Sequence, residues 1–235
     1  MSTKITFYGH SAFKIETEEK LTILIDPWLD NPLAKESPSD IRPNDLILLT
    51  HGHRDHLGSC IRLADSSGAE VVAIHEIQQY LFSKGLSKVT GMNIGGTYKT
   101  KGITIIMVPA IHSSSIQEGE KIIYGGEAAG FVLIFEDGMV IYHAGDTALF
   151  GDMALIRELY RPRIAMLPIG SHYVMGPREA AYAVRLLKPE MVVPIHYGTF
   201  PALTGTLDDF KKELENLSVN VQVMGLSAGE ELILE

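Results

Sequence analysis

Hydrophobic positions in the first third of the chain alternate with polar ones, the period of a strand with one buried face. The pattern recurs in three short runs, each ending in turn-forming residues: Ile5 to Phe7, Phe13 to Ile15 and Leu21 to Ile25. A fourth run, Leu46 to Leu49, is apolar throughout, as expected of a strand covered on both faces. These runs predict a sheet near the N-terminus.

The rest of the chain alternates between strand and helix patterns. We expect strands at 71–74, 103–108, 131–135, 139–142, 164–168 and 191–195, with short strands near 221–223 and 232–234. We expect helices at 57–67, 75–84 and 153–160, and others that begin at Pro177 and after Thr206. Early hairpins followed by this alternation predict an α/β fold with two mixed sheets, each covered on its outside by helices. We expect all of residues 1–235 to form one domain.

Several predicted strands share a feature at their C-terminal ends, where a residue able to bind a metal follows. These residues are Asp26, His51, His112, Asp146 and His196. Functional side chains in loops after the strands of a rigid sheet are a common α/β arrangement. The pattern therefore predicts one site built from distant parts of the chain.

The densest cluster of such residues follows the fourth strand, in the segment Thr-His-Gly-His-Arg-Asp-His-Leu-Gly at 50–58. Imidazole and carboxylate are the usual ligands of zinc and its first-row neighbours. Residues two apart in an extended loop point the same way, so His51 and His53 can reach one metal. Asp55 and His56 are adjacent and suit a second metal close by.

Two histidines do not complete a coordination sphere, because a hydrolytic metal takes about three protein ligands and a water. His112 is a good third ligand for the first metal and His196 for the second. Asp146 is suited to bridge the two, since a carboxylate has two oxygens. Such a pair of metals can share a hydroxide and clamp the attacking and leaving oxygens.

The segment at 50–58, followed in order by His112, Asp146 and His196, resembles the signature of the metallo-β-lactamase superfamily. The resemblance covers nearly the whole chain and implies a four-layer αβ/βα sandwich. It also implies that Asp26 supports the motif loop without binding metal. The segments 9–11, 25–27, 175–177 and 194–199 are similar to one branch, small bacterial and archaeal metal-dependent hydrolases with ascorbate-phosphate lactonases as distant relatives.

A charge count indicates the chemistry of the expected centre. Two divalent metals, the carboxylates of Asp55 and Asp146 and one hydroxide leave a net charge of about +1. Such a centre suits a small ester, lactone or phosphoester, which can carry an extra anionic group. We expect Asp55 to orient and deprotonate the attacking water. Zn²⁺ is the metal we favour, while Mn²⁺, Ni²⁺ and Fe²⁺ also fit these ligands.

Other polar residues carry two interpretations each. His143 either supports a ligand from behind or ends its strand. His172, after another strand end, either faces the substrate or does not, and His10 either lies near the pocket or is a turn residue. Ser113 to Ser115 form either an anion site or a polar loop. We expect His75 to lie at the surface, and Arg178 and Glu179 to form a helix's first turn.

Composition narrows the alternatives. The net charge of −9 opposes binding to a phosphate backbone, so a nuclease that trims transfer RNA is the weaker enzyme hypothesis. Redox chemistry is disfavoured because every ligand is present and these 235 residues have no room for a flavin-binding domain as well. A metal-bound scaffold without turnover stays open.

The single Cys60 is expected to be a buried thiol. No apolar run of about 18 residues occurs, so we expect a cytoplasmic protein off the membrane, with a homo-oligomer left open.

Overall fold

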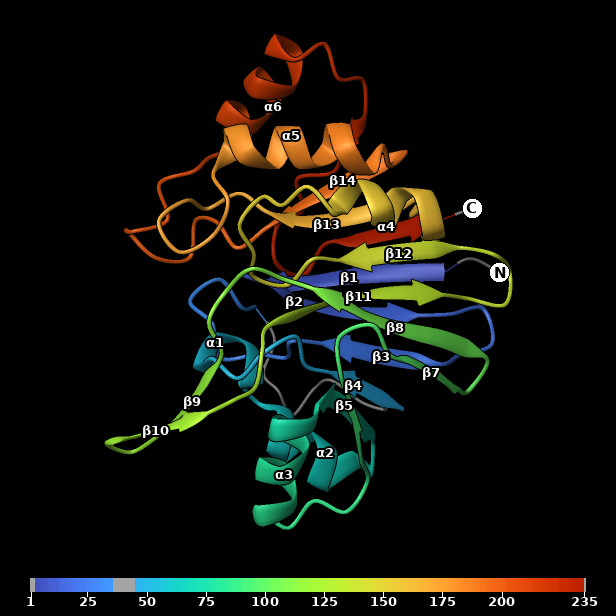
Figure 1. Ribbon diagram of the computed structural model, residues 1–235, viewed down its shortest axis with the longest axis vertical. Coiled ribbons are helices and arrows are strands. Elements are labelled where there is room, and N and C mark those ends of the chain that lie inside the picture. Colours follow the sequence, from blue (N-terminus) through green and yellow to red (C-terminus); the bar gives the residue numbers. More distant parts are fainter. Residues whose placement is uncertain (1–2, 36–44, 235) are drawn as a thin grey trace. The chain divides into compact units, whose positions relative to one another are not determined.

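The computed structural model of the chain describes residues 3–35 and 45–234 (Figure 1). The chain divides into two compact units. Unit 1 comprises Met1–Asn93, Ser113–Glu127 and Leu226–Glu235, and unit 2 comprises Ile94–His112 and Ala128–Gly225. Each unit is built on one seven-stranded sheet.

The sheet of unit 1 has the strand order β16-β1-β2-β3-β4-β5-β6. Its strands are β1 (Thr3–Gly9), β2 (Ala12–Glu16), β3 (Thr22–Ile25), β4 (Leu46–Leu48), β5 (Glu70–Ile74), β6 (Val89–Met92) and β16 (Glu231–Leu234). Pairing is antiparallel from β16 to β3 and parallel from β3 to β6. The helices of this unit are α1 (Arg54–Leu57), α2 (Cys60–Ser67) and α3 (His75–Ser83), of which α3 packs on β5 and β6.

The sheet of unit 2 has the order β15-β14-β13-β12-β11-β8-β7. Its strands are β7 (Thr97–Thr100), β8 (Ile103–Pro109), β11 (Ala129–Ile134), β12 (Val140–His143), β13 (Ile164–Pro168), β14 (Met191–Ile195) and β15 (Gln222–Val223). Its helices are α4 (Met153–Tyr160), α5 (Pro177–Leu187) and α6 (Leu207–Asn216). Helix α5 packs on β13 and against α4 and α6, and buried side chains from these elements form one core.

Strand direction brings the chemistry of each unit to one edge of its sheet. In unit 1, β1 runs parallel to β3 and β4, because the antiparallel β2 lies between β1 and β3. In unit 2, β8 runs parallel to β12, β13 and β14 for the same reason, with β11 between β8 and β12. The loops that follow these strands therefore leave each sheet at one edge, as the sequence predicts.

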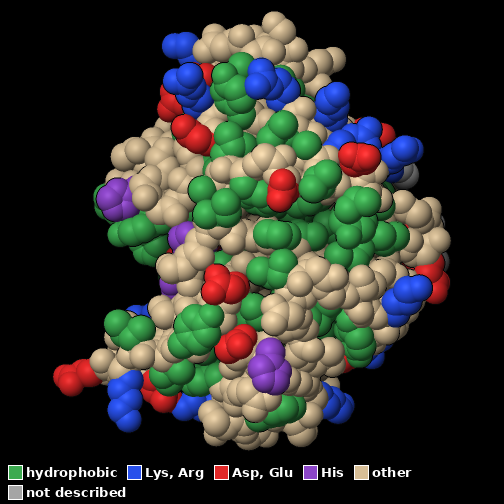
Figure 2. All heavy atoms as spheres, viewed as in Figure 1, with side chains coloured by type: hydrophobic (Ala, Val, Ile, Leu, Met, Phe, Trp, Pro, Cys, Tyr) green, Lys and Arg blue, Asp and Glu red, His purple; other side chains and the backbone are tan. Residues whose placement is uncertain are grey.

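A separate two-stranded sheet, β9 (Ser115–Glu118) and β10 (Lys121–Tyr124), belongs to unit 1. This hairpin projects from its unit (Figure 1), and Figure 2 shows acidic and basic side chains close together near its end. The acidic Glu118 and Glu120 adjoin the basic Lys121. The hairpin is thus an arm of mixed charge, not a basic one.

The fold class is confirmed as α/β, with two mixed sheets flanked by helices. The helix expected over 57–67 is confirmed as α2 from Cys60 to Ser67, but its start differs, because a separate short helix, α1, begins inside the motif and ends at Gly58. That residue has φ 42° and ψ −118°, which ends α1. Strands β6 and β7 and the β9–β10 hairpin escape prediction, because they are short and largely half-exposed. None of the helices within 3–35 and 45–234 is long and apolar enough to cross a bilayer.

Candidate metal centre

Asp26 organises the metal-motif loop of unit 1 from beneath it. Its carboxylate accepts hydrogen bonds from Thr50, through the backbone N–H at 2.8 Å and through Oγ1 at 2.7 Å. The Thr50 hydroxyl has one proton, which it gives to Asp26. The same hydroxyl lies 3.0 Å from His51 Nδ1 and must accept there. His51 therefore carries its proton on Nδ1, and its Nε2 has the lone pair that a metal ligand needs.

His56 is set in the same way by the same carboxylate. Its Nδ1 lies 2.7 Å from Asp26 Oδ2, and both side chains are fully buried. Because a carboxylate only accepts, His56 Nδ1 carries the proton and Nε2 the lone pair. A carboxylate behind a histidine is the usual support for a metal-binding imidazole. The hydrogen bonds of Asp26 thus set the tautomers of two expected ligands.

His51 and His53 bring their nitrogens together at the spacing of metal ligands. His51 Nε2 and His53 Nδ1 are 3.0 Å apart. Two ligands bonded to one tetrahedral zinc at 2.0–2.1 Å lie roughly 3.3 Å apart. Gly52 between them permits this, because a Cβ there would lie 2.8 Å from Ile116 Cγ1 and 3.1 Å from the carbonyl oxygen of Ser115. The donor set of unit 1 therefore fits a divalent metal.

Unit 2 contributes its own convergent set. Asp146 Oδ2 lies 3.0 Å from His196 Nε2 and 3.6 Å from His112 Nε2. These separations bracket the ligand spacing of a tetrahedral metal. Asp146 and His196 are buried, and His112 is half-buried. The loops after β8, β12 and β14 thus bring together the three residues predicted to complete the centre.

Backbone conformation marks two of these positions as constrained. Asp26 has φ 46° and His196 has φ 54°, in the left-handed region that non-glycine residues seldom adopt. Such residues cost free energy and persist where the surrounding structure holds them, often at functional sites. Each lies directly after its strand, where the turn re-aims the side chain.

Thr147 links the loops that hold the ligands of unit 2. Its Oγ1 accepts a 3.0 Å hydrogen bond from the N–H of Ile111, beside His112. Its carbonyl accepts from the N–H of Met175 at 3.0 Å, which ties in the loop after β13. The N–H of Ala148 returns a bond to the carbonyl of Ile111 at 3.0 Å. The residue after Asp146 thereby fixes where His112 stands.

Other polar residues named from the sequence fall into two groups: His143 shapes a turn beside a proposed ligand, while His172, His75 and the pair at 178–179 are exposed or lie at the start of a helix. His143 accepts a 3.1 Å hydrogen bond from the N–H of Gly145 at Nδ1, so it shapes the turn before Asp146. His172 is exposed, with its ring edge-on to Tyr173. His75 is exposed at the start of α3, as expected. Arg178 and Glu179 lie in the first turn of α5, also as expected.

The sequence gives no sign that Thr50, Ser114 and Thr147 orient the ligands, although Ser114 belongs to the run 113–115 for which either an anion site or a polar loop is expected. Ser114 Oγ accepts from the N–H of Gly52 at 3.1 Å and donates to the carbonyl of Gly125 at 3.0 Å. Thr50 links Asp26 to His51, and Thr147 accepts a hydrogen bond from the N–H of Ile111, next to His112. Their common signal is a hydroxyl residue adjoining or near a ligand, which is too ordinary a pattern to single them out.

The match to known proteins defines the class. The profile described as the beta-lactamase superfamily domain matches residues 22–197, most of the chain, so the chain belongs to this superfamily. That span includes Asp26 and every predicted metal ligand.

Close relatives narrow the class to one branch, the UPF0173 metal-dependent hydrolases. The member from Methanopyrus kandleri is 49% identical, covering 97% of this chain and 98% of its own. The member from Rubrobacter xylanophilus is 48% identical, covering 98% and 96%. Igni18, a metallo hydrolase from Ignicoccus hospitalis, superposes with a TM-score of 0.89 at 39% identity, covering 100% and 99%. The chain is accordingly a metal-dependent hydrolase with a His/Asp cluster able to bind metal.

Proposed function

We propose that this hydrolase cleaves a small ester, lactone or phosphoester with the help of two divalent metal ions, Zn²⁺ being the first choice. The ligands would be His51, His53 and His112 for one ion and Asp55, His56 and His196 for the other, with Asp146 between them. Bound there, such ions lower the pKa of a water molecule and polarise the bond to be cleaved.

The observation that carries the proposal is the fixed tautomer of two of these ligands. The bonds from Thr50 and His56 to Asp26 leave Nε2 of both His51 and His56 as a lone-pair donor. An imidazole prepared in this way binds metal without a proton shift. The spacings of His51 to His53 and of His196 to Asp146 support the same use.

Asp55 is the residue we propose for proton transfer. It lies in the single turn of α1, beside the proposed ligand His56, and is half-buried. A carboxylate in this position can orient a water molecule and take its proton. We propose that Asp26 and His143 support the ligands and that His172, on an exposed loop, meets the substrate.

The charge of the chain supports a small substrate over nucleic acid. Its net charge is −9, and the β9–β10 hairpin, which projects from its unit (Figure 1), combines Glu118 and Glu120 with Lys121. A backbone-binding arm would need a basic surface. Three further predictions stay untested: that residues 1–235 act as one hydrolase domain, that the protein is cytoplasmic, and that it forms a homo-oligomer. Cell fractionation tests the location, and light scattering tests the oligomeric state.

The test combines metal analysis with a substrate panel. Purified protein is assayed for bound metal, then for hydrolysis of lactones, phosphodiesters, phosphomonoesters and thioesters with added Zn²⁺ or Mn²⁺. We expect up to two metals per chain and turnover in one class. Less than one metal per chain with no hydrolysis would exclude the proposal.

A matched pair of variants separates catalysis from a metal-bound scaffold. Asp146→Ala should abolish turnover while the circular dichroism spectrum stays unchanged. Asp208→Ala, an exposed carboxylate in the first turn of α6, should leave turnover intact. Metal binding without turnover in any class would favour the scaffold.

A further inference from the structure

His10 occupies a costly position in unit 1. It lies in the two-residue turn between β1 and β2, where Gly9 pairs with Ala12. Its φ is 59°, in the left-handed region, and its side chain is fully buried. Glycine and asparagine adopt this conformation at the least cost, whereas a bulky ring there is uncommon. A buried imidazole at such a turn indicates that its contacts hold it there.

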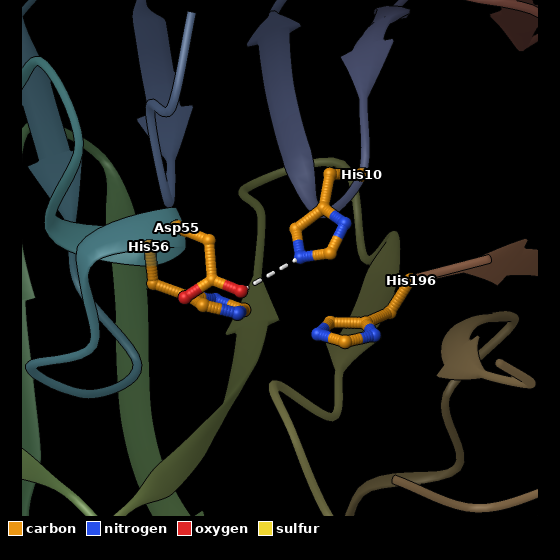
Figure 3. A group of neighbouring side chains, drawn as sticks. All are labelled: His10, Asp55, His56 and His196. Atoms are coloured by element: carbon orange, nitrogen blue, oxygen red, sulfur yellow. Dashed lines mark hydrogen bonds and ion pairs between the residues drawn. The ribbon is translucent and has the colours of Figure 1, made fainter. Parts of the chain in front are cut away.

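Those contacts lead to the metal motif. His10 Nε2 lies 3.1 Å from Asp55 Oδ2 (Figure 3). The ring stands edge-on to Trp28, with centroids 5.1 Å apart and an interplanar angle of 88°. A second ring, that of His56, lies 5.7 Å away at 63°. The imidazole is thus held from more than one side, with one nitrogen directed at the carboxylate.

The direction of this hydrogen bond follows from its acceptor. An ionised carboxylate cannot donate, so the proton between the two groups belongs to His10 Nε2. A charge-assisted bond of this kind restricts the rotation of the Asp55 side chain.

We propose that His10 is a positioning residue, which donates from Nε2 to Asp55 and sets that carboxylate for metal binding and for proton transfer from water. The inference rests on the function proposed above and adds a residue to it. The ligand atoms of His10, Asp55 and His56 lie within 4.8 Å of one another, so the competing possibility is that His10 binds the metal itself.

Two substitutions distinguish positioning from other roles. In His10→Gln, the amide nitrogen can reach about as far as Nε2 and donate to Asp55, yet an amide is a poor ligand for zinc. In His10→Asn, the residue still tolerates a left-handed φ, but its amide is too short to reach the carboxylate. The two variants therefore distinguish the effect of the hydrogen bond to Asp55 from the effect of the turn conformation.

The primary measurement is metal affinity by chelator competition, with the melting temperature of the metal-free protein as the folding control. We expect His10→Asn to weaken one metal site by 10–100-fold, the range for lost partners of ligands. We expect His10→Gln to stay near wild type and both metal-free variants to melt near it. In turnover, His10→Asn should lower kcat more than it raises KM.

The outcomes that overturn the inference are distinct. If His10→Gln loses as much affinity as His10→Asn, the residue is a ligand; if neither loses any, the hydrogen bond does no positioning. A matching fall in the metal-free melting temperature would make the role merely structural. Wild-type protein that binds no metal would instead contradict the proposed function, and this inference with it.

Discussion

Asp26 Oδ2 lies 2.7 Å from Nδ1 of His56, and the same oxygen takes the Thr50 hydroxyl proton at 2.7 Å. One carboxylate therefore fixes the imidazole of His56 directly and that of His51 through Thr50. Asp26 itself is held in a left-handed conformation to do so. This arrangement makes the protonation of two histidines depend on a residue that the proposed metal sites do not include.

Asp26→Asn tests that dependence. The amide nitrogen would present a donor to His56 Nδ1, favouring the tautomer with the proton on Nε2, where no lone pair then remains for a metal. We expect metal affinity to fall by roughly 10–100-fold. Stability should fall by about 2 kcal/mol or more, because buried hydrogen bonds to a charge are lost. Chelator competition and urea unfolding measure the two effects.

Asp45→Asn is the matched control, since Asp45 accepts from the N–H and Oγ1 of Thr22, both at 2.9 Å. It lies directly before β4, away from the C-terminal edge of the sheet. A loss of about 1 kcal/mol with unchanged metal affinity is expected. Equal effects of the two substitutions on metal affinity would contradict the special role of Asp26.

Thr147→Val tests the link between the ligand loops of unit 2. The substitution keeps shape but removes the acceptor for the N–H of Ile111. His112 should then lose its fixed place, and we expect kcat/KM to drop tenfold or more with about 1 kcal/mol of lost stability. Thr147→Ser keeps the hydroxyl and should behave almost as wild type. If valine and serine were equally active, the hydroxyl would have no part in placing His112.

The sequence predicts where the proposed ligands lie better than it predicts what holds them. His51, His112 and His196 follow strands that are recognisable from their apolar runs, and parallel strands place their ends at one edge of a sheet. The break between α1 and α2 cannot be predicted from the sequence pattern, because it depends on the unusual backbone of Gly58, which ends α1. Support by Thr147 depends on loops meeting in space, which no local pattern encodes.

Gly58→Ala tests the break between α1 and α2. A Cβ at this position would lie 2.5 Å from Trp28 Cα and 2.7 Å from the carbonyl oxygen of Pro27. Backbone, unlike a side chain, cannot move aside cheaply. We expect a loss of about 2–5 kcal/mol from overlap and strain together, measured by urea unfolding.

Gly85→Ala is the control within unit 1, since Gly85 has φ 91° and a methyl group added there would meet no described atom within 4 Å. It should cost only the conformational term, about 1–2 kcal/mol. Similar losses at the two glycines would show that the contact with the Trp28 segment contributes little.

Cys60 gives the last prediction, because its thiol is buried where reagents cannot reach it. Its side chain is fully buried in α2, and burial raises the pKa of the thiol far above its usual value, with the nearby charge of Asp26 adding to the rise. The reactive species is the thiolate, so native protein should resist a disulfide reagent such as DTNB at pH 8. Labelling should proceed only as fast as the protein unfolds and should accelerate with urea, while Cys60→Ala should give no signal. Rapid labelling under conditions where circular dichroism shows native structure would mean that α2 opens locally.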